Sequence, residues 1–342
     1  KKMEPTLVDI RAEFYKNIDF PEFDFSDVKG QESIKRCMEI AAAGGHNIIL
    51  IGPPGSGKTM LAKRLPSILP PMSLNEALET TKIHSVIGNT KNEGFLYQRP
   101  FRSTHHTISN VDLVGGGQYP RPGEISLSHN GILFLDELSE FKREVLEVMR
   151  QPLEDREVTI SRAKFTVTYP CSFMLVASMN QSPSGYFNDP NSPMTSSPHE
   201  MQRYLSKISG PLLDRIDIHI EVTPVPFEKL SEERKGESSV DIRQRVTAAR
   251  EVQSKRFTES KNVHYNAQMT VKQIRTYCKL SEESLTLLKT AMEKLHLSAR
   301  AYDRILKVAR TICDLANETD ILPDHIAEAI QYRSLDREGW LE

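Results

Sequence analysis

The sequence predicts an α/β domain, built on a parallel sheet between helices, that is followed by a smaller all-helical domain. Two short apolar runs, residues 48–51 and 132–135, are typical of buried parallel strands, since each is followed at once by glycine or acidic residues. After residue 226 the composition changes, and segments with a helical spacing of apolar residues succeed one another. These observations predict two domains of different class.

The first segments lead towards the strand at residues 48–51. We expect residues 1–24 to be a linker, with helical character near residues 10–15. The string D-F-S-D-V-K-G-Q-E then precedes a helix with apolar residues from position 34 to position 41. The chain begins with Lys1 and Lys2 in a polar stretch, which we interpret as the start of a piece cut from a longer protein.

A glycine-rich turn follows the first strand, in the string I-I-L-I-G-P-P-G-S-G-K-T at residues 48–59. It predicts a phosphate-binding loop, because glycines let backbone N–H groups surround a phosphate, Lys58 supplies a cation and Thr59 offers a hydroxyl to Mg²⁺. Residues 60–65 continue as a helix whose N-terminus favours an anion. A simple glycine turn is the alternative, which this context disfavours. The expected ATP-binding residues are Gly52, Pro53, Pro54, Gly55, Ser56, Gly57, Lys58 and Thr59.

The composition argues against several classes of protein. The 342 residues carry a formal net charge of −2, which argues against coating nucleic acid or membrane by bulk charge but leaves room for a local basic pore. The four cysteines form no Cys-x-x-Cys pair, so neither a disulfide framework nor a zinc site is indicated. We find no apolar run near eighteen residues and no signal peptide, and we expect a cytoplasmic protein without a membrane partner.

The middle of the chain alternates between irregular and regular segments. Residues 66–131 form the least regular long stretch, which we interpret as a functional insertion or disorder. We expect a helix at residues 142–153, a β-hairpin at residues 157–168 that turns near residue 162, and a strand at residues 172–177. A loop rich in proline, serine and asparagine should follow at residues 182–199, and a strand at residues 216–222. We then expect five helices, at residues 239–257, 271–278, 282–295, 299–316 and 323–332.

Polar residues at the ends of predicted strands complete a candidate catalytic site. Asp136 and Glu137 follow the strand at residues 132–135. We expect Asp136 to bind Mg²⁺, directly or through a water molecule, and Glu137 to act as the general base that activates the attacking water. Asn180 follows a neighbouring strand and is placed to bind the γ-phosphate or water, although an asparagine in a turn is the alternative. Arg215 lies between two aspartates, and by itself favours a surface ion pair.

The combination resembles an AAA+ ATPase of the clade with a pre-sensor hairpin and a helix-2 insertion. More closely, the strings F-R-S-T-H-H-T-I-S, P-R-P-G-E-I-S-L-S-H-N-G, M-Q-R-Y-L-S-K-I-S-G-P-L-L-D-R-I-D and A-I-Q-Y-R-S-L-D-R resemble the magnesium-chelatase-like ComM/YifB proteins of bacteria. The resemblance runs from about residue 25 to nearly the end of the chain. It implies residues 25–226 as the AAA+ core, 227–264 as a connecting helix and 265–342 as a helical lid, without the Lon-like N-terminal domain usual in this family.

The resemblance also implies roles for several residues. Asn180 becomes the sensor-1 residue, and Arg215 becomes an arginine finger that reaches the γ-phosphate bound by a neighbouring subunit. Arg300 is our choice for the sensor-2 residue in the lid, with Arg304 as its rival. A finger that acts between subunits implies a homo-oligomeric ring, which we expect to be a hexamer.

The chain departs from the family in the loop after Asn180. Family members often carry a cysteine cluster there that resembles a zinc site, whereas this chain has Ser182, Ser184, Met194 and Ser196. Serine and methionine do not make a structural zinc site, so we expect ATP and Mg²⁺ as cofactors and no zinc.

Several basic residues are candidates for contact with DNA. His105 and His106 are adjacent in the insertion. They are candidates for a contact with the substrate, but we favour the interpretation that they belong to a polar loop. Arginines and a lysine of the hairpin and the insertion are placed to line the pore of a ring and touch phosphates, against the alternative that neighbouring acidic residues balance them. These residues are Arg156, Arg162, Lys164, Arg99, Arg102 and Arg121.

The resemblance implies an ATP-driven ring motor that moves DNA in branch migration during uptake and recombination. A chelatase-type or chaperone-like ATPase that remodels a partner protein is the second hypothesis. A scaffold that binds ATP without hydrolysing it is the third, and Glu137 argues against it.

Overall fold

The structure, a computed structural model, describes residues 23–88, 95–162, 165–182, 207–225, 236–260 and 262–333, together with the single positions 14, 16, 200, 203 and 204. The expected helix near residues 10–15 lies largely outside the described residues. Lys164 and the loop positions 184, 194 and 196 lie outside them as well.

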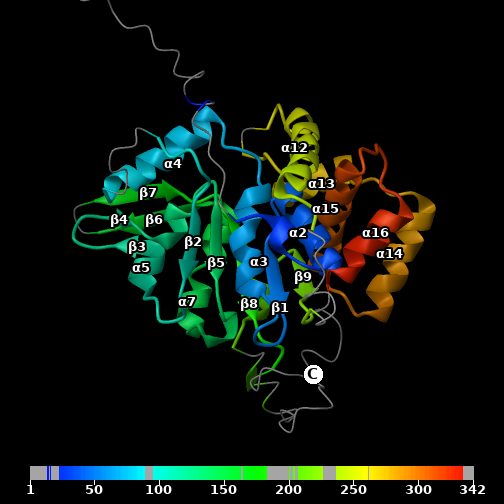
Figure 1. The fold of residues 1–342 in the computed structure, drawn as a ribbon, viewed down its shortest axis with the longest axis horizontal. Helices are drawn as coiled ribbons and strands as arrows, with labels where there is room; N and C mark the ends of the chain where they lie inside the picture. Colours follow the sequence, from blue (N-terminus) through cyan, green and yellow to red (C-terminus); the bar gives the residue numbers. More distant parts are fainter. Residues whose placement is uncertain are drawn as a thin grey trace, which may run out of the picture.

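A five-stranded parallel sheet forms the centre of the first domain, in the order β2-β5-β8-β1-β9 (Figure 1). Its register aligns Ile48 with Val176 on one side and with Ile218 on the other. The predicted parallel sheet between helices is thus confirmed, as is the following helical region. The strands are β1 (Ile48–Ile51), β2 (Phe101–Thr104), β5 (Ile132–Leu135), β8 (Met174–Met179) and β9 (Ile218–Glu221).

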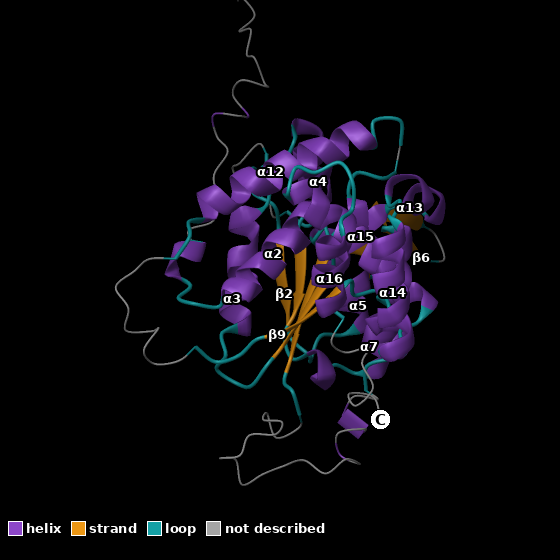
Figure 2. Ribbon diagram, turned by 90° about the vertical axis from the view of Figure 1, so that its right-hand side faces the viewer, coloured by secondary structure: helices purple, strands orange, loops and turns teal. Residues whose placement is uncertain are grey.

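The sheet buries both faces, because side chains of alternate strand residues point to opposite sides. Ile48, Phe134 and Val176 join one core, which continues into α2 (Glu32–Gly44) and the C-terminal helices. Ile49 and Leu133 join the other core, beneath α7 (Arg143–Glu147) and the hairpin. Figure 2, turned by 90°, shows the strands in the middle with helices on both sides.

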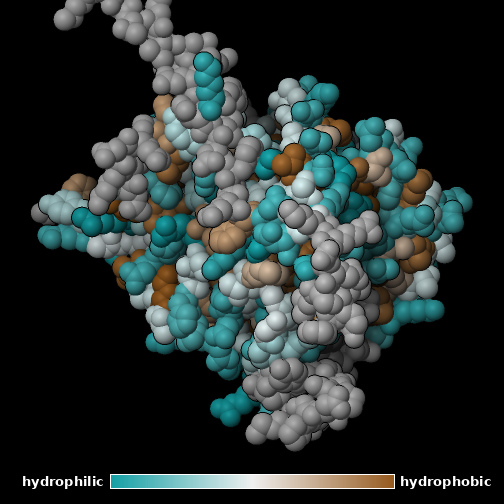
Figure 3. Space-filling view, in the orientation of Figure 1, coloured by the Kyte–Doolittle hydropathy of each residue, from teal (hydrophilic) through white to brown (hydrophobic). Residues whose placement is uncertain are grey.

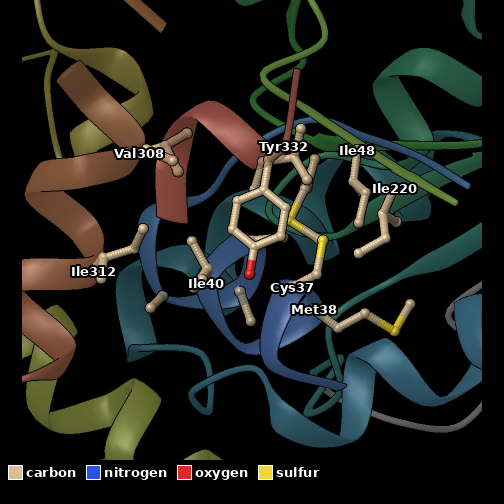
Figure 4. Packing of buried hydrophobic residues seen from close by; sticks show 14 of the residues in the cluster. Cys37, Met38, Ile40, Ile48, Ile220, Val308, Ile312 and Tyr332 are labelled. Carbon is tan, nitrogen blue, oxygen red and sulfur yellow. The ribbon is translucent and has the colours of Figure 1, made fainter. Parts of the chain in front are cut away.

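The C-terminal helices share the first core instead of forming a separate one. Figure 4 shows Tyr332 among Cys37 and Ile40 of α2, with Val308 and Ile312 approaching from the C-terminal helices. The C-terminal helices are therefore packed against the sheet domain along α2. These helices are α12 (Ser239–Arg256), α13 (Val271–Tyr277), α14 (Glu282–Lys294), α15 (Ala299–Leu315) and α16 (Pro323–Gln331), close to the predicted ranges.

Residues 66–131 are more regular than the sequence suggested. They contain α4 (Leu74–Val86), which begins with a Ser73–Glu76 capping box, and strand β2 of the main sheet. The interpretation of the whole stretch as insertion or disorder is wrong for these elements. The strand was hidden because Arg102 and Ser103 interrupt its apolar pattern at the edge of the sheet. The other elements of this region are η2 (Leu65–Ile68), α5 (Asn110–Val114), β3 (Gly115–Gly116), β4 (Arg121–Pro122) and α6 (Glu124–Leu127).

The helix expected at residues 142–153 is divided in two. α7 ends at Glu147, and α8 (Arg150–Asp155) begins after a short turn. Pro152 lacks the N–H that would bond to residue 148, so a continuous helix would lose a hydrogen bond there. The predicted hairpin follows as β6 (Glu157–Ser161) and β7 (Thr166–Pro170), and the remaining short helices are η1 (Phe25–Asp27), α3 (Lys58–Arg64), η3 (Leu138–Glu140), α10 (Gly210–Leu213) and η4 (Asn266–Gln268).

The outer surface is predominantly polar on the face that Figure 3 displays, with hydrophobic residues scattered among hydrophilic ones. Scattered apolar residues are normal on a protein surface. Within the described part of the chain, we find no helix with the length and apolar character required to span a membrane.

A half-buried ion pair fixes α4 against the sheet. Arg99 donates to both carboxylate oxygens of Glu76, at 3.0 and 3.1 Å, and also to the backbone oxygens of Pro70 and Asn130. Burial alone would raise the pKa of Glu76, but the charge of Arg99 and the hydrogen bonds from Ser73 outweigh it and lower the pKa to about 2. The pair therefore stabilises the fold while Glu76 is ionised.

The pKa of Glu76 predicts how stability depends on pH. A carboxyl group whose pKa is depressed on folding contributes stability above its unfolded pKa, near 4.5, and loses it as pH falls towards about 2. We expect roughly 3 kcal/mol of the acid-induced loss between pH 5 and pH 2 to come from this group. In Glu76→Gln this part of the pH dependence should be missing, as measured by urea unfolding at several pH values. The exposed Glu251→Gln is the matched control, and equal slopes in both variants would contradict the assignment.

Candidate active site

The phosphate-binding loop lies at the carboxyl end of β1, between the ends of β8 and β9. Close packing requires glycine at position 52, because a Cβ there would come within 2.3 Å of the Val222 backbone oxygen. Gly57 has a φ of 92°, a conformation that favours glycine, and immediately precedes α3. The loop thus leads directly from strand to helix, as the sequence predicted.

Lys58 points back across the loop. Its Nζ donates to the backbone oxygens of Gly52 and Pro53 at 2.7 and 2.8 Å, and to Asn180 Oδ1 at 3.3 Å. Burial lowers the pKa of Lys58, and the carboxylates of Asp136 and Glu137 partly offset this effect. The structure therefore brings Lys58 together with Asn180, from the neighbouring strand β8.

Asp136 lies opposite Thr59. The Thr59 hydroxyl donates to Asp136 Oδ2 at 3.1 Å, while Ser178 donates to Asp136 Oδ1. A hydroxyl and a carboxylate that face each other are the protein ligands expected for a magnesium ion that phosphates and water complete. The described residues contain no group of three or more histidine, cysteine, aspartate or glutamate side chains suited to a metal.

Glu137 is held in an unusual backbone conformation beside Asp136. Its φ of 57° lies in the left-handed region, and its N–H donates to Ser178 Oγ at 3.1 Å. The carboxylate is half exposed, and His106 Nδ1 lies 3.7 Å from its Oε2. Such backbone strain persists only where the surroundings enforce it. The structure thus brings His106 to the site, where the sequence favoured a polar loop.

The loop and the carboxylates fit a magnesium–nucleotide complex in one further respect. Ser56 Oγ is buried in the loop and has no hydrogen-bond partner among the described residues. A buried hydroxyl without a partner is costly unless a ligand satisfies it. ATP phosphates would be held by the loop and Lys58, and Mg²⁺ by Thr59 and Asp136.

Sequence reasoning missed three residues that support this site. Ser178 bonds both to Asp136 and to the backbone of Glu137. Gln31 donates to the backbone oxygens of Ser56 and Thr223, and Tyr204 donates to the backbone oxygen of Asn180. Ser178 lies two residues before Asn180, so an extended chain directs both side chains to the same side, and this spacing was a signal that could have found Ser178. No short-range pattern predicts the contacts of Gln31 or Tyr204.

Arg215 lies at the opposite end of the sheet. It precedes β9, and the Asn47 side chain, just before β1, donates to its backbone oxygen at 3.0 Å. Since β1 has four residues, about 13 Å of strand separates this edge from the phosphate loop. Arg215 forms an ion pair with Glu154 and donates to the Pro211 backbone oxygen. The structure therefore does not bring Arg215 to the phosphate loop of its own chain.

The two candidate sensor-2 residues lie at the same edge as Arg215 but have different surroundings. Arg300 is 68% exposed and pairs with Asp214. Arg304 donates at 2.9 Å to Asp217, which is 1% exposed. Burial alone would raise the pKa of Asp217, but the charge of Arg304 and the hydrogen bond with His46 hold it well below its ordinary value. Arg304 is thus committed to a buried carboxylate, whereas Arg300 is accessible.

A polar pocket lies at this edge, and further arginines line it. Arg156, Arg215 and Arg304 line it together with Glu154 and Asp217. Arg156 lies at the root of the hairpin, with a φ of 58°, and donates to the backbone oxygen of Asn262. The side chain thus contacts the segment that follows α12, and the place of Arg156 among pore residues stays a prediction.

Two other arginines expected to touch phosphates are held in ion pairs. Arg99 is bound to Glu76, as described above, and Arg102 donates twice to Glu124 at 2.6 Å. Arg121 and Arg162 are exposed, and the next subsections return to them.

The four cysteines, Cys37, Cys171, Cys278 and Cys313, are buried and not joined in disulfides. Burial raises the pKa of each thiol, to about 12 for Cys171 and Cys278. Ser182, the one position compared above with the family's cysteine cluster that the structure describes, is buried.

Comparison with protein families gives two matches. The model described as "Magnesium chelatase, subunit ChlI" matches residues 24–230, and "Magnesium chelatase, subunit ChlI C-terminal" matches residues 236–333. The two matches cover the sheet domain and the C-terminal helices in turn.

Curated relatives match most of the chain. The sequence is 47% identical to competence protein ComM of Haemophilus influenzae over 315 residues, which are 92% of this chain and 60% of that protein. It is 47% identical to the uncharacterised protein YifB of Escherichia coli over 317 residues, 92% of this chain and 61% of that protein. The uncharacterised protein Rv2897c of Mycobacterium tuberculosis is 40% identical over 312 residues, 91% and 61% respectively. The chain thus spans about three fifths of these relatives' length.

The different surroundings of Arg300 and Arg304 predict different effects of their removal. Arg304→Ala leaves the buried Asp217 carboxylate without its main cation and should destabilise the protein by about 3 kcal/mol or more. Arg300→Ala removes an exposed pair and should cost less than about 1 kcal/mol. Urea unfolding monitored by circular dichroism measures both values, and equal losses of stability in the two variants would refute this distinction.

Proposed function

The chain belongs to the family of the magnesium chelatase subunit ChlI, and on this basis we propose that it is a magnesium-dependent ATPase of the AAA+ type that works as a ring-shaped motor on DNA. One observation carries the ATPase step. The phosphate-binding loop Gly52–Thr59 stands at the carboxyl end of β1, and Thr59 and Asp136 face each other at 3.1 Å across it. This arrangement suits a nucleotide triphosphate with its magnesium ion.

In the proposed reaction, water attacks the γ-phosphorus while Glu137 accepts its proton as general base. Lys58 and the loop N–H groups balance the negative charge of the phosphates, and Asn180, as sensor 1, orients the γ-phosphate or the water. The contact between Lys58 and Asn180 supports this division of roles, because it brings both side chains to one point beside the loop. The bond between the β,γ-bridging oxygen and the γ-phosphorus breaks, which gives ADP and inorganic phosphate, and Glu137 then releases the proton to the solvent.

We further propose that Arg215 acts on the nucleotide of a neighbouring copy. Its position at the amino edge of the sheet supports this, since a strand of about 13 Å separates it from its own phosphate loop. Arg300, accessible at the same edge, is the proposed sensor-2 residue and would act from the same side. A complete site then needs two subunits, and a closed ring, in our proposal a hexamer, gives every subunit such a neighbour.

DNA is the proposed substrate of the motor, in line with branch migration of recombination intermediates. The name of the relative ComM refers to competence, and the exposed Arg121 and Arg162 on adjacent loops provide positive charge suited to phosphates. The family name favours a second candidate, in which ATP hydrolysis remodels a partner protein as in a chelatase. The experiments below separate the two.

Mixing two inactive variants tests the shared site. Lys58→Ala lacks the phosphate cation and Arg215→Ala lacks the finger, so each should lose at least about 99% of ATP turnover alone. In a ring mixed at equal amounts, about a quarter of interfaces pair an intact loop with an intact arginine, and about a quarter of the wild-type rate should return if interfaces act independently. Phosphate release measures the rate, and co-purification on one tagged variant verifies mixing. No recovery in mixed rings would refute the action of Arg215 between subunits.

DNA should stimulate ATP turnover if the motor acts on it. We expect forked or four-way DNA to raise the rate several-fold at low salt and to lose this effect as salt increases, because phosphate contacts release counterions. Glu137→Gln should still bind the DNA but hydrolyse ATP at least about a hundredfold more slowly, as the base is lost. If no DNA changes turnover while a partner protein does, the chelatase-like function replaces the DNA motor.

A further inference from the structure

An exposed pair of aromatic rings lies where the hairpin β6–β7 meets the loop between β3 and β4. Tyr119, from that loop, is 69% exposed, and Phe165, the residue before β7, is 47% exposed. Their ring centroids lie 6.2 Å apart with an angle of 37° between the planes. A single exposed aromatic ring is normal on a protein surface, but two from separate segments that lie together indicate a binding surface.

The two loops that carry these rings are joined firmly. Tyr169 of β7 donates its hydroxyl to the Pro120 backbone oxygen at 2.9 Å, and Arg162 donates to the Gly117 backbone oxygen at 3.4 Å. The backbone also packs closely, because a Cβ at Gly115 would come within 2.6 Å of Ile160. The segments that carry the aromatic pair are therefore joined by several contacts, and strands β3, β4, β6 and β7 lie beyond the β2 edge of the sheet at the left of Figure 1.

The surroundings of the pair are basic and rich in hydroxyl groups. Arg162 and Arg121 are exposed beside the rings. Along the outward face of the hairpin, Thr159 pairs with Thr168 at 2.9 Å and Ser161 with Thr166 at 3.0 Å. Exposed carboxylates of this region are Glu157, at the root of the hairpin, and Asp112 on α5, which accepts a hydrogen bond from Ser109.

We propose that Tyr119 and Phe165 form a stacking platform for unpaired nucleotide bases, with Arg121 and Arg162 binding the adjoining phosphates. An aromatic ring stacks on the face of any base, and hydroxyl and guanidinium groups bind the sugar–phosphate backbone. Bases inside a duplex are already stacked on one another, so the platform selects single strands, forks and junctions. This inference rests on the proposed action on DNA and names the form of DNA that the loops hold.

A polypeptide is the other class of macromolecule that an exposed aromatic pair could bind. It has no regular negative charge to match two arginines, and its side chains would gain little from the row of hydroxyl groups. The chemistry of the aromatic pair and its surroundings therefore favours nucleic acid.

Binding of a fluorescent single-stranded oligothymidylate, followed by anisotropy with the intact chain, tests the platform. Tyr119→Ala combined with Phe165→Ala should weaken this binding about tenfold or more and affect blunt duplex much less. Tyr119→Phe keeps the ring and should bind like the wild type. Phe23→Ala is the matched control, since Phe23 is 46% exposed but lies elsewhere, and it should leave binding unchanged. Thermal unfolding of every variant verifies the fold.

The outcomes separate this inference from the proposed function. If the wild type binds single strands and the folded double variant binds them equally well, the platform is wrong and the DNA function stands. If the wild type binds no DNA of any form, both are wrong. Loss of binding to unfolded casein in the double variant, with DNA binding intact, would assign the aromatic pair to polypeptide instead. Should the double variant unfold, Phe165→Ala alone, with at least a fivefold loss expected, decides the question in its place.

Discussion

All five strands of the central sheet run in the same direction, and this constraint organises the rest of the molecule. Parallel strands present all their carboxyl ends at one edge, where the phosphate-binding loop, Asp136 and Asn180 meet. Their amino ends lie at the other edge, where Arg156, Arg215 and Arg304 line one pocket. A single chain therefore keeps the candidate phosphate-binding loop and these three arginines apart. The separation follows from strand direction alone and does not depend on the detailed position of any side chain.

The buried carboxylate of Asp217 connects helix α15 to the central sheet. It receives hydrogen bonds from the Asn47 N–H and from Arg304 of α15, and His46 Nδ1 lies 3.4 Å away. His46 in turn contacts Thr311 of α15 at 2.8 Å. A buried ion pair adds little stability compared with apolar packing, but losing one partner is costly. The network thus makes the orientation of α15 specific, while the shared hydrophobic core supplies most of its stability.

The elements that the sequence predicted well are those with a local signal. Apolar runs, the glycine-rich loop and helical spacing identified β1, β5 and the C-terminal helices, because such patterns report burial along a continuous segment. β2 escaped notice because an edge strand with polar residues lacks this pattern. Likewise, Asp136 and Glu137 were predicted as site residues from their positions after β5. The contacts of Ser178 and His106 could not be predicted, because they join segments that are distant in the sequence. The direction of Arg156 depends on a residue more than one hundred positions away, Asn262.

The root of the hairpin β6–β7 lies close to the amino edge of the sheet, where Arg215 is found. Glu154, the ion-pair partner of Arg215, lies in α8, and β6 starts only three residues later with no flexible loop between them. Arg156 fastens the same short segment to the C-terminal domain. Glu154 and the hairpin thus belong to one continuous segment, so the carboxylate that pairs with Arg215 and the first residue of β6 are joined by only a short length of backbone.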